Sequence, residues 1–273
     1  MNKIYQVYQV SDSTGETLDR IFLAIKSQFS NFECKTVHYS FTRTKNQTDK
    51  IISKCKDQDR VIILYTIVDN NLAAYLKSEC DKANIPCYEA LGGLISDFSK
   101  LLKQEASHKP SAQHALDEEY YKRIEAVQFT MSHDDGKIIS DINKSDIVLI
   151  GISRTSKTPT SMYLANRGYK TCNIPIIPNK ELPEQVIKNS EKICTIGLIC
   201  DPIRLADVRK NRVQFLHEDR PKDYVDEKKI SSELDNSKKL FKKYNWPTID
   251  VTRKSVEETA ASIIKIFDIL NTK

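Results

Sequence analysis

The sequence predicts an α/β protein with two lobes and largely parallel sheet structure. Short β-branched and aromatic runs alternate with longer helical patterns along the chain, which is typical of parallel sheets covered by helices. At roughly 150 residues per domain, the length of 273 residues allows two domains, each large enough to bury a core. We expect an N-terminal α/β lobe over residues 1–105, a connector over 106–143 and a C-terminal lobe over 144–273.

The first lobe alternates strands and helices from its first residues. The run 61–68 is almost entirely apolar, as expected of a strand buried on both faces. The patterns predict strands over residues 3–10, 35–41, 61–68 and 86–89, and helices over 15–29, 47–55 and 72–83. Periodicity then weakens, and the connector contains a charged helical segment, 116–127, followed by the polar turn Ser132–Gly136. Connectors of this length are commonly functional.

The second lobe restarts with the buried run 146–150. The helix that follows, 158–166, is closed by Gly168, which suits the left-handed position after a helix. The last helix begins at Ser255, where S-V-E-E forms a capping box with Glu258. Between them the patterns predict strands over 172–177, 195–200 and 248–251, and helices over 184–190, 205–215 and 226–244.

Composition excludes several classes of protein. A formal net charge of +5 is too weak, and too evenly spread, to indicate a nucleic-acid partner. The N-terminus lacks the apolar segment of a signal peptide, and the run 61–68 is far shorter than the ~20 residues that cross a membrane. We therefore expect a cytoplasmic protein without a membrane partner. Two basic clusters are expected to be solvated helix faces: Arg209, Lys210 and Arg212, and Lys238, Lys239, Lys242 and Lys243.

The seven cysteines show no metal or redox spacing. They include no C-x-x-C pair and no cluster with histidine at zinc spacing. Reduced and mostly buried thiols are therefore expected in a cytoplasmic protein.

The strongest functional signal is the string GISRTSKT, placed between a buried strand and a helix. This layout matches a P-loop, in which backbone N–H groups and the helix N-terminus cradle phosphates, a lysine reaches the terminal phosphates and a hydroxyl holds Mg²⁺. The C-terminal lobe is therefore predicted to be P-loop-kinase-like. The alternative is a polar turn that contains Lys-Thr by chance. The predicted phosphate-binding residues are Gly151, Ile152, Ser153, Arg154, Thr155, Ser156, Lys157 and Thr158.

One residue of this loop departs from the usual pattern. Ser156 stands where G-x-x-x-x-G-K-[ST] has its second glycine, so we expect a turn that differs in detail because serine tolerates positive φ less well. Asp201 ends an apolar strand and is expected to hold Mg²⁺ together with Thr158, the alternative being a plain turn before proline. Arg204, or Arg154 inside the loop, could neutralise the phosphoryl charge in transit.

Two further groups are candidates for the site. The string SDSTGET begins a helix in the first lobe and resembles the flavodoxin phosphate loop, the alternative being a simple helix cap. Its predicted phosphate ligands are Ser11, Ser13, Thr14, Gly15 and Thr17. In the connector, His133, Asp134 and Asp135 could supply a general base or a metal ligand, although D-D-G is also a common turn.

Five strings occur in one order over nearly the whole chain: VSDSTGET, HDDG, GISRTSKTPTSMYLANRGYK, GLICDPIRL and DVTRKSVEETA. In these strings the sequence resembles the pyruvate, phosphate dikinase regulatory proteins and the related phosphoenolpyruvate synthase regulatory proteins. The resemblance implies a bifunctional enzyme and a homodimer. As a serine/threonine kinase it would use ADP to phosphorylate, and so inactivate, an active-site threonine of the dikinase. With inorganic phosphate it would remove that group, release pyrophosphate and restore activity.

The resemblance also assigns the loop Gly151–Thr158 to ADP. Together with the physical interpretation, it suggests that Lys157, Thr158 and Mg²⁺ hold the β-phosphoryl group. Asp134, Asp135 or Asp201 would then accept the proton of the target threonine, and the Ser11–Thr17 segment would hold phosphate. Whether the target is the dikinase or the synthase stays open, and we favour the dikinase.

Two other classes of function remain. A small-metabolite P-loop kinase would share the strand, loop and helix but would need no partner protein. A flavodoxin-like module that binds FMN or senses a nucleotide would depend on the Ser11–Thr17 segment alone.

Overall fold

The chain folds as two compact α/β units, residues 1–115 and 116–273. The structure is a computed structural model that describes residues 4–114, 117–178, 180–216 and 222–272. Each unit contains one four-stranded sheet whose strands all run parallel, which confirms the predicted fold class. The segment expected as a connector, 106–143, is divided between the units, because residues from 116 onward group with the second.

The first sheet has the strand order β2-β1-β3-β4. Its strands are β1 (Tyr5–Ser11), β2 (Cys34–Tyr39), β3 (Val61–Thr66) and β4 (Cys87–Glu89). The helices of this unit are α1 (Glu16–Lys26), α2 (Lys45–Lys56), α3 (Asn70–Lys82), α4 (Gly92–Leu102) and the 3₁₀ turn Ala112–His114.

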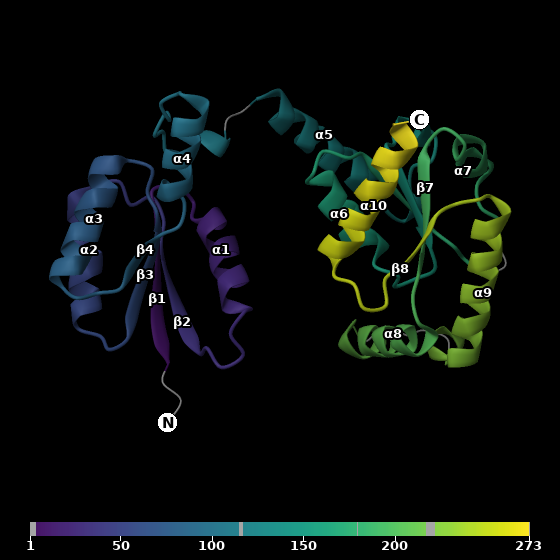
Figure 1. Cartoon of the computed structure of the whole chain (residues 1–273). Coiled ribbons are helices and arrows are strands. Elements are labelled where there is room, and N and C mark those ends of the chain that lie inside the picture. Colours follow the sequence, from purple (N-terminus) through teal and green to yellow (C-terminus); the bar gives the residue numbers. More distant parts are fainter. Residues whose placement is uncertain (1–3, 115–116, 179, 217–221, 273) are drawn as a thin grey trace. The chain divides into compact units, whose positions relative to one another are not determined.

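Helices cover both faces of this sheet (Figure 1). On one face, α2 and α3 pack against alternate residues of the central strands, among them Val10 and Ile63. On the other face, Leu18 and Phe22 of α1 pack against Val7 and Leu64. The alternation follows from the strand period of two, which points successive side chains to opposite faces.

Helix α4 was not predicted from the sequence. It begins with Gly92 and Gly93, which are poor helix formers, and it has no side-chain cap. Its large apolar residues do not give a buried stripe, since Leu94 and Phe98 are each 60% exposed and Leu101 is 77% exposed. These residues, together with Ile95 and Leu102, nevertheless have the spacing of one helical face, so the sequence analysis missed a helical pattern that the two glycines at its start obscured.

The second sheet has the order β6-β5-β7-β8. Its strands are β5 (Ile147–Gly151), β6 (Thr171–Pro175), β7 (Cys194–Ile199) and β8 (Thr248–Asp250). Its helices are α5 (Glu118–Ser132), α6 (Lys157–Ala165), α7 (Glu184–Asn189), α8 (Pro202–Leu216), α9 (Glu227–Lys243) and α10 (Val256–Asn271). The 3₁₀ turns are η2 (Asp134–Gly136), η3 (Ile142–Lys144) and η4 (Lys222–Val225).

Strand β5 is buried on both faces. Ile147 and Leu149 pack toward α6 and α10, whereas Val148 and Ile150 pack toward α7 and α9, on the opposite side in Figure 1. Gly197 of β7 lets α9 lie close, because a Cβ there would come within 2.4 Å of the Phe241 ring. The uninterrupted apolar run of β5 is thus the consequence of helices on both sides.

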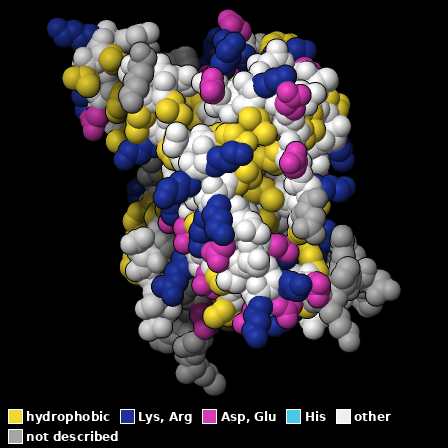
Figure 2. All heavy atoms as spheres, turned by 90° about the vertical axis from the view of Figure 1, so that its right-hand side faces the viewer, with side chains coloured by type: hydrophobic (Ala, Val, Ile, Leu, Met, Phe, Trp, Pro, Cys, Tyr) yellow, Lys and Arg dark blue, Asp and Glu magenta, His cyan; other side chains and the backbone are white. Residues whose placement is uncertain are grey.

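Several local predictions are confirmed. Gly168 has φ +90°, as its place after α6 requires. The capping box at α10 forms in both directions, with Ser255 Oγ accepting from Glu258 N and the Glu258 carboxylate accepting from Ser255 N. Five of the seven cysteines are buried. Within the described ranges, no helix combines the length and apolar character that a membrane span needs. On the face in Figure 2, basic and acidic side chains are interspersed.

Candidate functional site

The candidate phosphate loop joins the end of β5 to the start of α6. Because β6 and β7 lie on opposite sides of β5, the strand order reverses between β5 and β7. In open parallel sheets, ligands bind in the crevice outside the carboxyl ends of strands at such a reversal. The loop 152–156 therefore lies where this topology favours a binding site.

The loop begins at a position that only glycine can occupy. A Cβ at Gly151 would lie 2.6 Å from Thr155 Oγ1 and 2.8 Å from the Leu198 carbonyl oxygen. The buried Thr155 hydroxyl donates a hydrogen bond of 3.0 Å to the Ile152 carbonyl, which closes the loop on itself. Gly151 is therefore required because β7 leaves no room for a side chain, and not because of its backbone angle.

Two loop residues adopt the left-handed conformation, Arg154 with φ +74° and Ser156 with φ +58°. The expectation that serine would avoid positive φ here is wrong, since Ser156 itself takes the left-handed angle, and a turn that differs in detail stays a prediction. Left-handed residues at alternate positions are typical of backbone concavities that bind anions. Ser156 caps α6 without a side-chain hydrogen bond, so no side chain fills the helix N-terminus.

Lys157 lies inside the loop and is only 5% exposed. Its Nζ donates a 3.0 Å hydrogen bond to the Ile152 carbonyl, which engages one of the three ammonium N–H groups. Burial lowers the pKa of Lys157 to about 8, although Asp135 and Asp134 oppose the shift. The remaining donors of this desolvated cation are available to a phosphate.

Thr158 lies beside Asp134, one of the connector residues predicted as a general base or metal ligand. The Thr158 hydroxyl donates to Asp134 Oδ1 at 3.1 Å, and Asn173 Nδ2 donates to the same Asp134 oxygen at 2.6 Å and to Thr158 Oγ1 at 3.0 Å. Asn173 is fully buried on β6 and was missed by the sequence analysis, because only the parallel pairing of β5 and β6 brings it to the loop.

Two buried polar atoms around the loop have no hydrogen-bond partner among the described residues. They are Arg154 Nε and Asn173 Oδ1. Buried polar groups are nearly always paired, so orphaned ones indicate a ligand or ordered water. Arg154 is a suitable partner for a phosphate, and the hydroxyl of Thr158 and carboxylate of Asp134 are hard oxygen ligands of the kind Mg²⁺ takes. The donor set around the loop therefore fits a magnesium-bound nucleotide.

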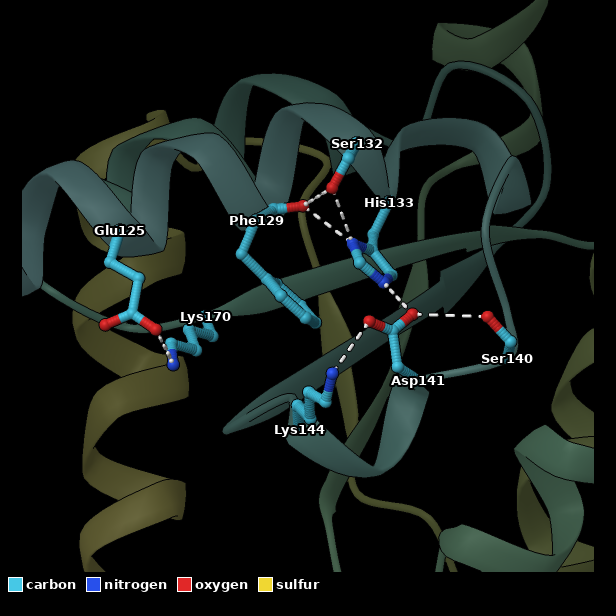
Figure 3. Close-up of polar contacts among 8 residues, drawn as sticks. All are labelled: Glu125, Phe129, Ser132, His133, Ser140, Asp141, Lys144 and Lys170. Atoms are coloured by element: carbon cyan, nitrogen blue, oxygen red, sulfur yellow. Dashed lines mark hydrogen bonds and ion pairs between the residues drawn. The ribbon is translucent and has the colours of Figure 1, made fainter.

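The His133 ring lies between the end of α5 and Asp141, as Figure 3 shows. The ring is 2% exposed and stacks on Phe129, and its Nε2 lies 3.0 Å from Asp141 Oδ1 while Nδ1 lies 2.7 Å from the Phe129 carbonyl. The His133 hydrogen bond, with help from Lys144, lowers the pKa of Asp141. Both ring nitrogens are engaged, so His133 fixes the end of α5.

Asp135 is the carboxylate of this turn that remains exposed. It has φ +53°, and it is the first of the charges that oppose the lowered pKa of Lys157. No hydrogen bond to its carboxylate occurs among the residues that the structure describes. The Asp135 carboxylate therefore lies exposed near the loop.

Asp201 and Arg204 lie at the end of β7, on the same edge of the sheet as the loop. Asp201 Oδ1 accepts from Arg204 N at 3.0 Å, which makes Asp201 the N-terminal cap of α8. Its backbone N–H donates to Thr252 Oγ1 at 2.8 Å. The carboxylate in contact with Thr158 is that of Asp134, and the pairing of Thr158 with Asp201 on a metal stays a prediction.

Arg209 anchors the loop from α8. The expectation of an exposed basic face is wrong at this position, because Arg209 is 1% exposed. Its guanidinium donates to the Ser153 carbonyl at 3.3 Å, to the Tyr224 carbonyl at 3.1 Å and to Glu233 Oε2 at 2.8 Å, and lies over the Tyr224 ring. The carboxylate of Glu233 compensates the buried positive charge of Arg209. The sequence pattern gives no sign of this pairing, because the two residues lie on different helices.

In the first unit, the Ser11–Thr17 segment forms a small pocket at its own reversal of strand order, between β1 and β3. The pocket has a volume of about 200 Å³, and Thr66, Lys109 and Gln113 also line it. Gly15, with φ +91°, begins α1 without any side-chain cap. The alternative of a serine or threonine that merely caps the helix is thus not what the structure has.

The serines of this segment are already engaged. Ser11 Oγ accepts from Thr66 Oγ1 and from Ser13 N, each at 3.1 Å, and Ser13 Oγ lies 2.8 Å from Ser111 Oγ. Asp12 accepts from Val68 N at 2.7 Å, and burial raises the pKa of its carboxyl. Any phosphate there would rely on backbone N–H groups and Lys109 rather than on free hydroxyls.

Within the described ranges, no three His, Cys, Asp or Glu side chains gather closely enough to hold a metal by themselves. Mg²⁺ in phosphoryl-transfer sites is usually held by one or two protein ligands together with the substrate phosphates.

Comparison with known proteins gives the family. The profile of the kinase/pyrophosphorylase family matches residues 7–264. The chain belongs to this family, whose members are phosphotransferases.

Among curated proteins, the chain is 58% identical over 269 residues to a protein from Pelagibacter ubique, covering 98% of each. It is 41% identical to a protein from a Chelativorans species and 42% identical to one from Rhizobium meliloti, covering 96% of each chain. All three are named as pyruvate, phosphate dikinase regulatory proteins.

A solved methylenetetrahydrofolate dehydrogenase/cyclohydrolase from Campylobacter jejuni is 13% identical, with a TM-score of 0.20, over 98% of this chain and 87% of that one. A TM-score this low carries no argument about fold.

Proposed function

We propose that this protein is a bifunctional regulator of pyruvate, phosphate dikinase. As a kinase it transfers the β-phosphoryl group of ADP to a threonine hydroxyl of the dikinase and leaves AMP. As a phosphorylase it uses inorganic phosphate to remove that group as pyrophosphate. The loop Gly151–Thr158, with a buried lysine and a hydroxyl at the start of α6, is the observation that carries the proposal. The names of the relatives support the dikinase as target.

In the kinase direction, the threonine oxygen forms a bond to the β-phosphorus while the bond to the bridging oxygen breaks. Lys157, Arg154 and the backbone N–H groups of the loop bind the phosphates and offset charge in the transition state. Asp135 accepts the threonine proton, because its carboxylate is exposed and lies near Lys157, whereas Asp134 is engaged by Thr158 and Asn173. Asp201 is the second candidate base, and Arg204 a second source of positive charge.

Mg²⁺ would be held by Thr158 and Asp134, with Asp201 as a further candidate ligand. When bound, the ion supplies charge that neutralises the phosphate oxygens. Asn173 keeps the Asp134 carboxylate turned toward Thr158 through its two hydrogen bonds.

In the reverse activity, an oxygen of inorganic phosphate forms a bond to the phosphothreonine phosphorus. The bond to the threonine oxygen breaks, and the oxygen regains its proton. The Ser11–Thr17 pocket is a candidate site for inorganic phosphate in the first unit. We further expect a cytoplasmic homodimer, as the resemblance implies.

The test mixes the protein with ADP, Mg²⁺ and catalytically phosphorylated dikinase, and follows threonine phosphorylation by mass spectrometry. Parallel reactions replace ADP by ATP, and the dikinase by phosphoenolpyruvate synthase. We expect modification of the dikinase with ADP only. Modification of the synthase alone would transfer the proposal to that target. Transfer from ATP to a small molecule without a partner would instead favour a metabolite kinase.

Lys157→Met tests the loop. It should abolish both activities while the protein stays folded, and Lys239→Met, on the exposed face of α9, serves as its control. Full activity of Lys157→Met would overturn the assignment of the loop.

A further inference from the structure

A second pocket, of about 940 Å³, lies at the ends of β7 and β8. It is lined by residues of two segments, 201–207 after β7 and 250–254 after β8. The second segment is the string DVTRK, which the proposed function leaves without a role. Both strands run parallel to β5, so their carboxyl ends meet at the edge that carries the phosphate loop. Strand β7 lies between β5 and β8, so the end of β8 is about two strand spacings of about 4.8 Å each from the end of β5.

A single threonine fixes the two segments to each other. The Thr252 hydroxyl donates to the Asp250 carboxylate, and the same oxygen accepts from the Asp201 backbone N–H at 2.8 Å. Thr252 N also donates to Asp250 Oδ1 at 2.9 Å. The side chains on either side of the pocket are therefore carried by loops whose relative position is fixed.

Three cationic side chains line this pocket: Arg204 from the first segment, and Arg253 and Lys254 from the second. All three are exposed, and none forms an ion pair with any residue that the structure describes. Elsewhere on the unit, several lysines pair with a carboxylate one helical turn away, as Lys188 does with Glu184 at 2.7 Å. Three cations without an ion pair, carried by two chain segments, therefore line the same pocket.

The carboxylates of the pocket compete with an anion less than their number suggests. Asp201 caps α8, and Asp250 accepts from Thr252, whose hydrogen bond is the main cause of the lowered pKa of Asp250. Both carboxylates stay charged, but their oxygens already accept hydrogen bonds from the two segments. With Asp207 the pocket has three carboxylates and three cations, and none of the three cations forms a side-chain hydrogen bond with a described residue.

We propose that this pocket binds a phosphate group of the second substrate through Arg204, Arg253 and Lys254. The inference rests on the proposed function, because it places the phosphate of the second substrate beside the loop that is proposed to bind ADP. Guanidinium groups fork onto phosphate oxygens, and the ammonium of Lys254 adds a point charge. The phosphate is either that of the phosphothreonine or free inorganic phosphate, which share this chemistry.

The test measures the binding of two probes, blocked phosphothreonine and inorganic phosphate, by ³¹P nuclear magnetic resonance titration. Saturating ADP and Mg²⁺ fill the phosphate loop. The double variant Arg253→Gln/Lys254→Gln is compared with wild type, with Lys109→Gln at the pocket of the first unit, and with the exposed control Lys239→Gln. We expect at least about tenfold weaker binding of one probe in the double variant only, since hydrogen bonds to charged groups contribute about 1.5–3 kcal/mol.

Loss of phosphothreonine binding assigns the pocket to the acceptor, and loss of inorganic phosphate binding assigns it to the co-substrate. Wild-type affinity of the double variant for both probes overturns the proposal, as does an equal loss in Lys239→Gln. Should wild type fail to modify any target while the double variant still loses the probe, the proposed function fails and the phosphate pocket stands.

Discussion

Ser156→Gly is predicted to stabilise the second unit. Ser156 is held at φ +58°, ψ +21°, and its hydroxyl makes no capping bond that glycine would lose. A non-glycine residue in this conformation costs about 1–2 kcal/mol. Glycine removes that cost, but it also makes the unfolded chain more flexible, which lowers the free energy of unfolding by about 0.4–1 kcal/mol. The net gain should be about 0.5–1 kcal/mol, or a rise in Tm of about 1–4 °C for a unit of this size.

Trp246 provides the assay, because it is the one tryptophan of the chain and is buried in the second unit against Tyr244. Thermal unfolding followed by its fluorescence reports on the unit that contains the loop. The matched control is Ser262→Gly in the interior of α10, where the backbone is helical and Ser262 Oγ donates to Glu258 O. The control should lower stability by about 0.5–1 kcal/mol. An unchanged or lower Tm for Ser156→Gly would refute the argument that the loop is strained at this residue.

Three further predictions concern the same loop. Because the pKa of Lys157 is lowered to about 8 in the folded protein, the unfolded chain binds an extra proton between about pH 8 and 10.5, so stability should rise with pH there. Lys157→Met should remove that part of the rise in urea unfolding; identical pH profiles for both proteins would contradict the assignment. Gly151→Ala should cost about 1–3 kcal/mol by overpacking in the Trp246 melts. Gly93→Ala lies in the first unit with nothing within 4 Å of its Cβ, and it should be neutral or stabilising in melts followed by far-ultraviolet circular dichroism. Glu233→Gln leaves the buried Arg209 charge uncompensated and should lower stability by about 3 kcal/mol; a loss below 0.5 kcal/mol in urea would show that the pair is not needed.

The loop could be predicted from the sequence because its signal is local. A buried strand, a short and mostly polar loop and a helix follow one another directly, and each element forms within one residue of where the pattern places it. The helix after Asp201 was expected from residue 205, but it begins at Pro202. Asp201 caps it and proline occupies the first helical position, which is the arrangement that favours an early start.

The residues that position the loop could not be predicted, because their partners are distant in sequence. Asn173 meets Asp134 across 39 positions, and Arg209 meets Ser153 across 56. Arg209 carries the same charge as its exposed neighbours, and only the carboxylate of Glu233 and two carbonyls make its burial possible. Strand pairing and helix packing create these contacts, and neither leaves a periodic pattern around the residue itself.

The contacts around the loop explain how the chain itself maintains a strained shape. Two left-handed residues, Arg154 and Ser156, cost together about 2–4 kcal/mol. Opposing this cost, the Ile152 carbonyl receives hydrogen bonds from Thr155 and Lys157, and Arg209 holds the Ser153 carbonyl from outside. Each bond fixes a residue next to a left-handed one, so relaxation of the loop would break several at once. Because the loop already has its shape, little binding free energy is lost in ordering it when a phosphate binds.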